Sequence, residues 1–529
     1  MGAVRVLDCT LRDGGYCNQW SFGYENAKKV VAGLVEAGVD IIECGFFSTK
    51  GEYGKEVTKF NTLSEVTEIL PANRVGKKFV VMANYGEISI DDVPDRSSET
   101  PDGIRVAYHK KDRKAALELC KSIKTKGYDV FIQAMVSVVY TDQEFLDMIK
   151  EINELKPYAF YIVDSFGLMK RRDMLRFFYL VDHNLNQDIT LGFHSHNNMQ
   201  LAFSNAQTLV DLSPSRGLIL DSSIFGMGRG AGNLCTELLV DYLNDEVGSC
   251  YDLKPILSLM DGVIGQFYRQ QPWGYSLPNY LSASHNAHPN YAGYFDDKKT
   301  LTVESMDELF TMMDESKRFS FDREYAEELY LRYMEAGEAH ADNMADFQRR
   351  LSGKCVLLIA PGKSSIEERD AVRAAADEEG QVIVSVNFDS PVVQSDYIFV
   401  SNMRRFRELD EGVRSRCIAT SNIPPDGVYL QVDYRSLLCE VQGIRDNAGL
   451  MAIRFLINNG VKAIRLAGFD GYSRVANENY CEGYMDHASK TAVLDATNRG
   501  VSEVLGRYAQ ETAISFVTSK RYLSIGTEA

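Results

Sequence analysis

Short apolar segments rich in β-branched residues recur through the first half of the chain, spaced so that a helix fits between them. We expect strands at 4–8, 39–44, 78–83, 103–108, 129–136, 159–164, 190–194 and 217–221. Amphipathic stretches predict helices at 26–37, 113–124, 142–155, 172–182 and 199–211. Continuous apolar strands that alternate with helices indicate a parallel sheet covered on both faces. Such units, repeated through about 245 residues, match a (β/α)8 TIM barrel, with an open doubly wound sheet as the alternative.

The pattern changes after the eighth expected strand. Helices are predicted at 253–268, 305–314 and 323–336, with no strand signal between them. Strands return at 355–360, 381–386, 396–401, 416–419 and 463–467, with helices at 367–379 and 450–459. A chain of 529 residues exceeds what one hydrophobic core usually serves. We therefore predict a barrel at 1–248, a helical extension or lid at 249–348, and a smaller Rossmann-like α/β domain at 349–529.

The composition narrows the choice of partners and compartment. The formal net charge is −17 and the isoelectric point is near 5.1, so nucleic acid and anionic membrane surfaces are poor partners. The sequence has no apolar run long enough to span a bilayer and no signal peptide at its start. The ten cysteines include no CxxC pair. We expect a cytoplasmic protein whose cysteines are reduced.

Polar side chains follow several expected strands, where TIM barrels carry their active sites. His194 and His196 close the seventh strand, and residues i and i+2 of a strand project to the same side. Asp13 follows the first strand, two positions away around a closed barrel, and can add a carboxylate. Two nitrogens and one oxygen leave positions for water and a chelating substrate. We predict a divalent metal site, with structural histidines as the alternative.

A divalent cation at this place would bind the carboxylate and keto oxygens of a 2-oxo acid and act as a Lewis acid. Arg12 can stabilise the developing oxyanion, or else form a salt bridge at the barrel mouth. Glu43 is the further catalytic candidate from a strand end. The predicted substrate contacts are Arg105, His109, Asp164 and Ser165.

The glycine run at 226–233 partly fits a dinucleotide-binding fingerprint, but it follows the eighth strand of a barrel instead of opening a βαβ unit. We therefore interpret it as a close turn that directs the Asn233 amide toward the metal shell. A helix N-terminus there can also hold a carboxylate or phosphate.

Three motifs together resemble the DRE-TIM metallolyase, or HMG-CoA-lyase-like, superfamily: LDCTLRDGG at 7–15, GFHSHNN at 192–198 and GMGRGAGN at 226–233. The resemblance covers about residues 1–300 and is closest to the 4-hydroxy-2-oxovalerate aldolases. It implies a TIM barrel with pyruvate-enolate chemistry, and a divalent metal, most often manganese, with magnesium, cobalt and zinc as alternatives. It also implies ligation by Asp13, His194 and His196, enolate stabilisation by Arg12, and a nearby role for Asn233.

The resemblance fails at one position. The aldolases carry a proton-transferring histidine two residues after the RDG glycine, where this chain has Tyr16. A tyrosine can relay a proton, less readily at neutral pH. The segment 279–291 is rich in groups that suit a lid, and Tyr291 is the predicted acid/base residue within it. Its alternatives are Tyr280, His285 and His288, or a purely structural aromatic cluster.

The second domain carries weaker signals. APGKSS at 360–365 is not a Walker A loop, because Leu357 stands where the first glycine is needed, but a helix N-terminus there suits an anion. The stretch 449–473 resembles the nucleotide-sugar-binding half of bacterial sialyltransferase-like proteins. The predicted nucleotide contacts are Ser364, Asn387, Asn402 and Asp470. The alternative is a scaffold or oligomerisation domain.

These observations favour a metal-dependent aldolase or lyase that acts on a 2-oxo acid and an aldehyde, in a homo-oligomer. An acyl-CoA condensing transferase on the same barrel is one alternative, which predicts thiol release from acetyl-CoA. A barrel retained as a scaffold is another, and it predicts metal binding without turnover. A bifunctional enzyme of sugar or surface-polysaccharide synthesis is the third.

Overall fold

The computed structural model describes residues 2–74, 76–335, 343–475, 478–481 and 491–522. The chain divides into two compact units. Unit 1 comprises residues 1–293 and 314–321, and unit 2 comprises residues 294–313 and 322–529. The segment 249–348, predicted as a separate extension, is therefore shared between the two units.

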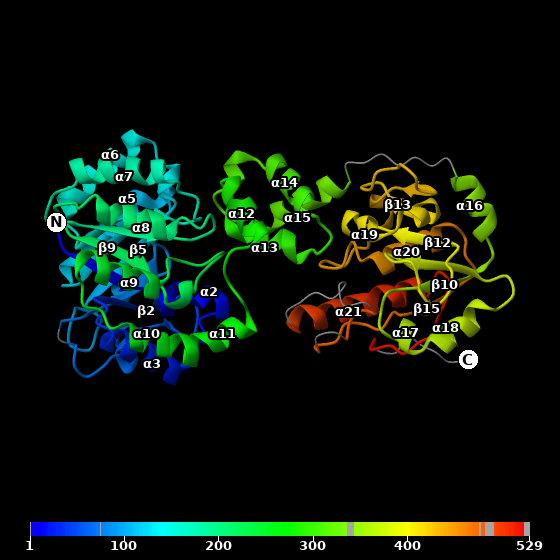
Figure 1. The fold of residues 1–529 in the computed structure, drawn as a ribbon, viewed down its shortest axis with the longest axis horizontal. Helices are drawn as coiled ribbons and strands as arrows, with labels where there is room; N and C mark the ends of the chain where they lie inside the picture. Colours follow the sequence, from blue (N-terminus) through cyan, green and yellow to red (C-terminus); the bar gives the residue numbers. More distant parts are fainter. Residues whose placement is uncertain (1, 75, 336–342, 476–477, 482–490, 523–529) are drawn as a thin grey trace. The chain divides into compact units, whose positions relative to one another are not determined.

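Unit 1 is built on a closed parallel barrel (Figure 1). Its strands are β1 (Val4–Asp8), β2 (Ile41–Phe47), β4 (Lys78–Asn84), β5 (Gly103–Tyr108), β6 (Asp129–Ala134), β7 (Ala159–Asp164), β8 (Thr190–Ser195) and β9 (Leu218–Ser222). They pair in the order β1-β9-β8-β7-β6-β5-β4-β2, and β1 also pairs with β2, which closes the ring. The short strand β3 (Lys59–Phe60) pairs in parallel with the carboxyl end of β2. The predicted TIM barrel is confirmed.

Helices cover the outside of the barrel, because each presents an apolar stripe to the strands. The main ones are α3 (Tyr24–Glu36), α5 (Arg113–Thr125), α6 (Asp142–Leu155), α7 (Arg171–Asn184), α8 (Ala202–Asp211) and α9 (Thr236–Val247). The turns α1 (Thr10–Asp13), α2 (Gly15–Asn18) and α4 (Leu63–Val66) lie after β1 and β3. Inside the barrel, the Tyr161 ring lies against Gly192, where a Cβ atom would approach it to 2.3 Å.

Beyond the barrel, α10 (Leu253–Leu259), a π-helical turn (Met260–Ile264) and α11 (Gly265–Gln270) replace the single predicted helix at 253–268. The next helices are α12 (Leu277–Ser284) and α13 (Pro289–Asp297). Ala283 of α12 packs with Val136, Phe166 and Leu168, which lie just past the carboxyl ends of β6 and β7, and Phe319 joins this cluster. The predicted lid region of unit 1 thus lies against the catalytic end of the barrel.

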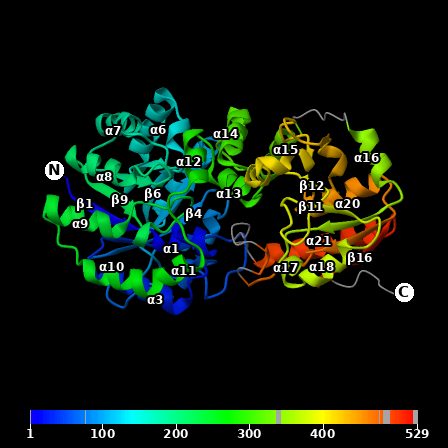
Figure 2. The same ribbon diagram turned by 45° about the vertical axis from the view of Figure 1, so that its right-hand side comes forward.

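Unit 2 contains a seven-stranded parallel sheet (Figure 2). Its strands are β10 (Cys355–Ile359), β11 (Val382–Val386), β12 (Tyr397–Val400), β13 (Cys417–Thr420), β14 (Leu430–Val432), β15 (Ala463–Ala467) and β16 (Ala513–Phe516). The order is β14-β13-β12-β11-β10-β15-β16. The chain runs outward from β10 to β14, then crosses back to the other side of β10, so the direction of the connections reverses between β10 and β15. This arrangement is that of a doubly wound fold.

The helices of unit 2 are α14 (Val303–Met312), α15 (Arg323–Met334), α16 (Met344–Leu351), α17 (Ser364–Glu367), α18 (Arg369–Ala376), α19 (Met403–Glu408), α20 (Ala448–Asn458) and α21 (Thr491–Tyr508). The strands β14 and β16 and the helices α16 and α21 were not predicted. In β14 only three residues pair, and β16 is an edge strand with half of its residues exposed, so neither has the apolar run of a central strand. The five strands predicted from apolar runs are all present.

Among the described residues, no helix has the length and apolar character that a membrane span requires. All ten cysteines are free thiols, and Cys9 and Cys44 are fully enclosed.

A single arginine closes the amino-terminal end of the barrel. Arg216 is 2% exposed and donates five hydrogen bonds of 2.8–3.2 Å. One acceptor is the Asp182 carboxylate, and the others are the backbone carbonyls of Asp182, Leu185, Asn186 and Ile189. The guanidinium therefore satisfies the carbonyls at the end of α7 and in the turn that leads into β8.

We predict that Arg216→Met destabilises unit 1 by about 3–5 kcal/mol, because four backbone carbonyls and the Asp182 carboxylate lose a buried donor. Urea unfolding followed by circular dichroism measures the change. Arg172→Met is the matched control, because the Arg172 side chain, on α7, is 93% exposed. It should change the free energy of unfolding by less than about 0.5 kcal/mol. Equal stability of the two variants would contradict the structural role of Arg216.

Candidate active site

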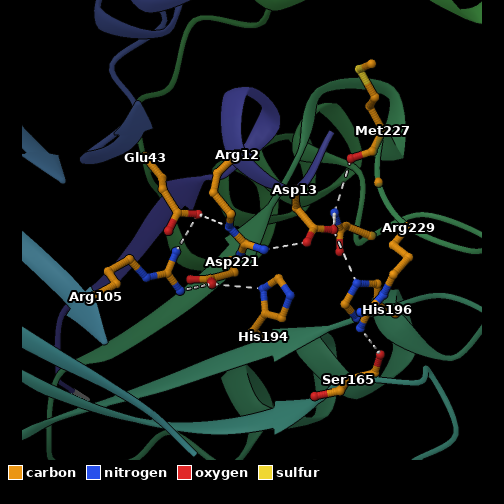
Figure 3. Close-up of polar contacts among 12 residues, drawn as sticks. Arg12, Asp13, Glu43, Arg105, Ser165, His194, His196, Asp221, Met227 and Arg229 are labelled. Carbon is orange, nitrogen blue, oxygen red and sulfur yellow. Dashed lines mark hydrogen bonds and ion pairs between the residues drawn. The ribbon is translucent and has the colours of Figure 1, made fainter. Parts of the chain in front are cut away.

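A carboxylate and two imidazoles meet at the carboxyl end of the barrel (Figure 3). Asp13 ends the turn α1 after β1, His194 lies on β8, and His196 follows the last residue of β8. All three are buried, with exposed fractions of 1%, 4% and 4%. One ligand atom from each lies within 4.8 Å of the others. The strand spacing thus brings together the three residues predicted from the sequence.

The second ring nitrogen of each histidine has its own acceptor. His194 Nδ1 lies 3.0 Å from Asp221 Oδ2, and His196 Nδ1 lies 3.2 Å from the backbone oxygen of Asp164. Both acceptors require a proton on Nδ1, so each Nε2 is left with its lone pair. A metal-binding histidine is held in its ligating tautomer by such a contact.

The Asn233 amide is oriented by a backbone carbonyl. Its Nδ2 donates to Met227 O at 3.1 Å and to Asp13 Oδ2 at 2.7 Å. Because only the NH₂ group can face a carbonyl, the orientation of the amide is fixed. Its Oδ1 is buried and has no hydrogen-bond partner among the described residues. An unsatisfied buried oxygen beside three potential ligands points to a cation.

The donor set fits a divalent cation. His196 Nε2 lies 3.2 Å from Asp13 Oδ2, close to the separation of about 3 Å between neighbouring ligands on a six-coordinate ion with bonds of about 2.1 Å. Two imidazoles with carboxylate and amide oxygens suit manganese, cobalt or zinc, and the oxygens also suit magnesium.

Buried ion pairs connect the candidate metal ligands across the barrel. Arg12 donates to Asp13 and, at 2.8 Å, to Glu43 Oε2. Arg105 lies 2.9 Å from the same Glu43 oxygen and also donates to Asp221, which holds His194. The path from Asp13 to His194 is therefore a continuous chain of alternating charges.

These contacts set the protonation states. Burial alone would raise the pKa of Asp13, but Arg12 and the two histidines hold it well below its usual value. Burial lowers the pKa of His194 despite its contact with Asp221. Asp13 is thus anionic and His194 neutral at neutral pH, the forms in which both bind a metal.

The glycine run serves this geometry. A Cβ atom at Gly228 would lie 2.3 Å from Asn233 Nδ2 and 2.7 Å from Asp13 Oδ2. Gly232 has φ of +83°, and a Cβ atom there would lie 2.0 Å from Gly226 O. Only glycine allows the turn to pass so close to the ligands. The glycine run therefore forms a close turn beside Asp13 and Asn233, as the sequence predicted.

The mouth above the ligands combines a phenol with a cation. Tyr16 lies on α2, is 40% exposed, and packs edge-on against Trp20. The Arg229 guanidinium lies 5.3 Å from the Tyr16 ring centroid and donates to Ser165 O at 3.0 Å. Desolvation raises the pKa of Tyr16 although Arg229 opposes this. The Tyr16 side chain is therefore a neutral phenol at neutral pH.

The charge of Arg229 also affects the pKa values of two histidines, His109 and His288. Burial lowers the pKa of His109, with smaller effects from Lys111 and Arg229. Burial, with the Arg229 charge, lowers the pKa of His288 to about 2. The Asn290 amide N–H donates to His288 Nδ1 at 3.1 Å, so the neutral His288 ring carries its proton on Nε2.

Other predicted residues have structural contacts. Arg105 is fully buried between Glu43 and Asp221, which favours a positioning role over a substrate contact. Asp164 accepts from the Leu168 and Met169 amides at 3.0 Å, and Ser165 Oγ accepts from Val136 N at 2.9 Å. The Tyr291 hydroxyl, inside the lid, donates to Lys317 O and Ser320 O.

Two residues of the site were not predicted. Asp221 is the last-but-one residue of β9, and the rule that polar residues at strand ends form the site would have found it. Arg229 lies inside the glycine run at 226–233, and no motif in the sequence distinguishes it from the residues around it. Its role depends on the turn that folds it over Tyr16, which sequence spacing does not reveal.

A buried carboxylate and two imidazoles at the strand ends of a (β/α)8 barrel define a metal-site TIM barrel. Residues 3–263 match the family model described as HMGL-like, which confirms the resemblance inferred from the motifs. Over residues 3–263, just under half of the chain, the barrel is similar to HMGL-like proteins.

Named relatives match about half of this chain. An oxaloacetate decarboxylase of Mycobacterium tuberculosis is 26% identical over 51% of this chain and 81% of its own length. A 4-hydroxy-2-oxovalerate aldolase of Carboxydothermus hydrogenoformans is 27% identical over 50% of this chain and 79% of its own. The crystal structure of the N-terminal domain of a putative aldolase from Bacteroides vulgatus is 28% identical, covering 57% of this chain and 99% of that one, with a TM-score of 0.49.

We predict that Asp221→Asn weakens Mn²⁺ binding about 10- to 100-fold, because the His194 ring and Arg105 lose the charge that orients them. Asp13→Asn should remove measurable binding. Electron paramagnetic resonance of free Mn²⁺ during titration measures the affinity. Asp241→Asn, which alters an exposed carboxylate on α9, is the control and should bind like the wild type. Wild-type affinity in Asp221→Asn would show that the contact does not orient the ligand.

Proposed function

We propose that the barrel is a divalent-metal-dependent carbon–carbon lyase that acts on a 2-oxo acid through its enolate. The observation that carries this proposal is the buried set Asp13, His194 and His196 with Arg12 directly beside it, inside an HMGL-like domain. The named relatives act on 2-oxo acids, as an aldolase and as a decarboxylase. Both reactions break the bond between the α- and β-carbons of the keto group and leave the enolate of a 2-oxo acid.

We propose manganese as the cation, held by Asp13, His194, His196 and the Asn233 oxygen. Bound there, it would supply Lewis acidity toward the keto and carboxylate oxygens of the substrate. The formal charges of the site favour such a partner. Three carboxylates, Asp13, Glu43 and Asp221, face two guanidinium groups, Arg12 and Arg105, which leaves one negative charge.

Arg12 is the residue that stabilises the enolate oxygen. Its guanidinium is 5% exposed and is fixed by Asp13 and Glu43, so it is preorganised and needs no rearrangement during the reaction. Glu43 and Arg105 act through Arg12 and Asp221 and are positioning residues. We assign the substrate carboxylate to Arg229, whose guanidinium lies over the Tyr16 ring at the mouth, with His109 as a further contact.

Tyr16 is the proposed proton relay. It occupies the place of the aldolase histidine, three residues beyond Asp13, and faces the Arg229 cation. His288, with its proton on Nε2 and its low pKa, is suited to donate a hydrogen bond to a carbonyl oxygen but not to accept a proton. Asp164, Ser165 and Tyr291 stay predictions whose contacts are structural. The aldehyde partner, the cytoplasmic location and a homo-oligomeric state also stay predictions.

We predict that the protein exchanges the methyl protons of pyruvate with deuterium in D₂O when Mn²⁺ is added, as proton NMR would detect. Asp13→Asn and His194→Gln should abolish exchange above the rate of free Mn²⁺, because each removes a ligand. Arg12→Lys should lower the rate about 10²-fold, since the bidentate geometry is lost. Arg172→Met is the control and should exchange like the wild type.

Exchange that persists in Asp13→Asn would contradict a role for this site. Bound Mn²⁺ without any exchange on pyruvate or on longer 2-oxo acids would contradict the enolate chemistry and support a barrel that serves as a scaffold.

The pH profile tests Tyr16. Since its pKa is raised, the basic phenolate is scarce at neutral pH, and the exchange rate should rise about tenfold per pH unit up to pH 9. Tyr16→Phe should lose this dependence together with most of the rate. Tyr16→His should exchange faster at pH 7, with a profile that levels off near the imidazole pKa of about 6.5. A Tyr16→Phe profile identical to that of the wild type would exclude the relay.

A further inference from the structure

Unit 2 has a cavity of about 320 Å³ at the carboxyl edge of its sheet. The cavity is formed by the residues that follow β10, β11, β12 and β15, and by the start of α20. It includes the point between β10 and β15 where the connections reverse direction. Doubly wound folds bind their ligands in the crevice at this point, and the volume lies within the range of about 300–1,000 Å³ for small-molecule sites.

Three asparagines on the cavity wall have their amides fixed in one orientation. The Oδ1 atoms of Asn387, Asn402 and Asn447 accept backbone N–H groups at 3.2, 2.9 and 3.2 Å, from Ser401, Arg405 and Leu450 respectively. Each side chain therefore presents its Nδ2 donors elsewhere. Within the described part of the chain these Nδ2 groups have no hydrogen-bond partner. A ligand rich in acceptor oxygens or ring nitrogens would satisfy them.

The first turn of α20 adds backbone donors at the same cavity. This helix has eleven residues, and the N–H groups of Ala448 and Gly449, which line the cavity, have no partner within the helix. Asn447 is its N-cap. A Cβ atom at Gly449 would approach the Phe469 ring to 2.8 Å. The absence of a side chain at Gly449 therefore lets the first turn of α20 pack against this ring. The positive end of a helix with free N–H groups favours a phosphoryl group.

Another part of the wall is aromatic and carries a carboxylate. Phe469, Tyr472 and Tyr522 line the cavity and offer faces on which a planar base can stack. The Asp470 carboxylate is held by the backbone N–H of Ser364 at 2.8 Å and by its hydroxyl. The start of α17, predicted as an anion cradle, is thus occupied by Asp470, and Ser364 positions this carboxylate instead of lining the cavity.

The formal charges around the cavity cancel. The charged residues that line it are Asp297, Asp446, Asp470, Lys298, Lys299 and Arg405. Attraction by net charge is therefore weak, and recognition rests on the oriented amides, the helix terminus and the aromatic faces. A simple anion would need only charge, and an apolar ligand would leave the donors unsatisfied. A nucleotide makes use of both the donors and the aromatic faces.

We propose that this cavity binds a nucleotide: the phosphoryl group lies at the first turn of α20 beside the Asn447 amide, and the nucleoside contacts Asn387, Asn402 and the aromatic wall. A carboxylate such as Asp470 accepts hydrogen bonds from ribose hydroxyls in doubly wound nucleotide sites. The proposal does not depend on the chemistry of the barrel, because every residue that carries it belongs to unit 2.

Isothermal titration calorimetry of the full chain tests the proposal, with CMP, UMP, AMP and GMP as probes. At least one of them should bind in the micromolar range. Ribose 5-phosphate, inorganic phosphate and the matching nucleoside should each bind at least tenfold more weakly, since each lacks part of the recognised structure. Failure of all four nucleotides to bind would overturn the proposal. Equal affinity for inorganic phosphate would overturn the nucleoside part and leave an anion site.

Two substitutions locate the binding. Asn402→Asp and Asn447→Asp keep an oxygen for the helix caps, at which Asp and Asn are equally effective, but replace the Nδ2 donors with a negative oxygen. Each should weaken nucleotide binding at least tenfold while the thermal unfolding midpoint stays within a few degrees. Gln510→Glu adds the same charge at an exposed position of unit 2 and should change neither quantity. Unaltered affinity in both Asn variants would place the nucleotide elsewhere and overturn the assignment.

Discussion

The barrel mouth depends on one chain of buried ion pairs, from Asp13 through Arg12, Glu43 and Arg105 to Asp221. None of these charges is stable in a protein interior alone, because desolvation costs several kcal/mol for each ion. Together they hold one another in place. The two ends of this series of ion pairs meet the candidate metal ligands, because Asp13 is itself one of them and Asp221 orients His194. The surplus of one negative charge has a consequence for binding. A divalent cation turns it into a surplus of one positive charge, which matches the single charge of a 2-oxo acid carboxylate.

The sequence predicts the barrel and its three ligands because both depend on local rules. The strands are continuous apolar runs, and the spacing of His194 and His196 alone determines that both face the same side. The order of the strands then brings Asp13 close. The roles of Arg105, Ser165 and Asp164 are not predictable in this way, because only the partners that each side chain meets in the folded barrel distinguish them. Arg105 lies between two carboxylates, whereas Asp164 and Ser165 accept backbone N–H groups.

In unit 2 as well, the sequence predicts residues at strand ends but not residues whose position depends on tertiary contacts. Asn387 and Asn402 follow predicted strands and were recognised as strand-end residues, but Asn447 caps a helix and has no such signal. Its place at the cavity depends on α20 beginning beside the loop that follows β15. Ser364 illustrates the reverse case. A serine at a helix start after a strand suggests an anion site, yet the acidic group that it holds is Asp470 of the same unit. Whether an anion site at the start of a helix is free depends on the tertiary structure, because the competing carboxylate lies 106 residues away in the chain.

The replacement of a histidine by Tyr16 bears on the direction of the proposed reaction. An imidazole is half-protonated near neutral pH and serves equally as acid or base. A phenol with a raised pKa is almost wholly protonated, so it is ready to give a proton and poorly prepared to take one. Cleavage of a 2-oxo acid ends when the enolate carbon receives a proton, while condensation starts when that carbon loses one. Arg229, lying over the phenol ring, stabilises the tyrosinate that remains after the proton has been given. The pair Tyr16 and Arg229 therefore favours a cleavage that needs no base, such as loss of carbon dioxide, over condensation and over retro-aldol cleavage, because both of these start when a base removes a proton from the substrate.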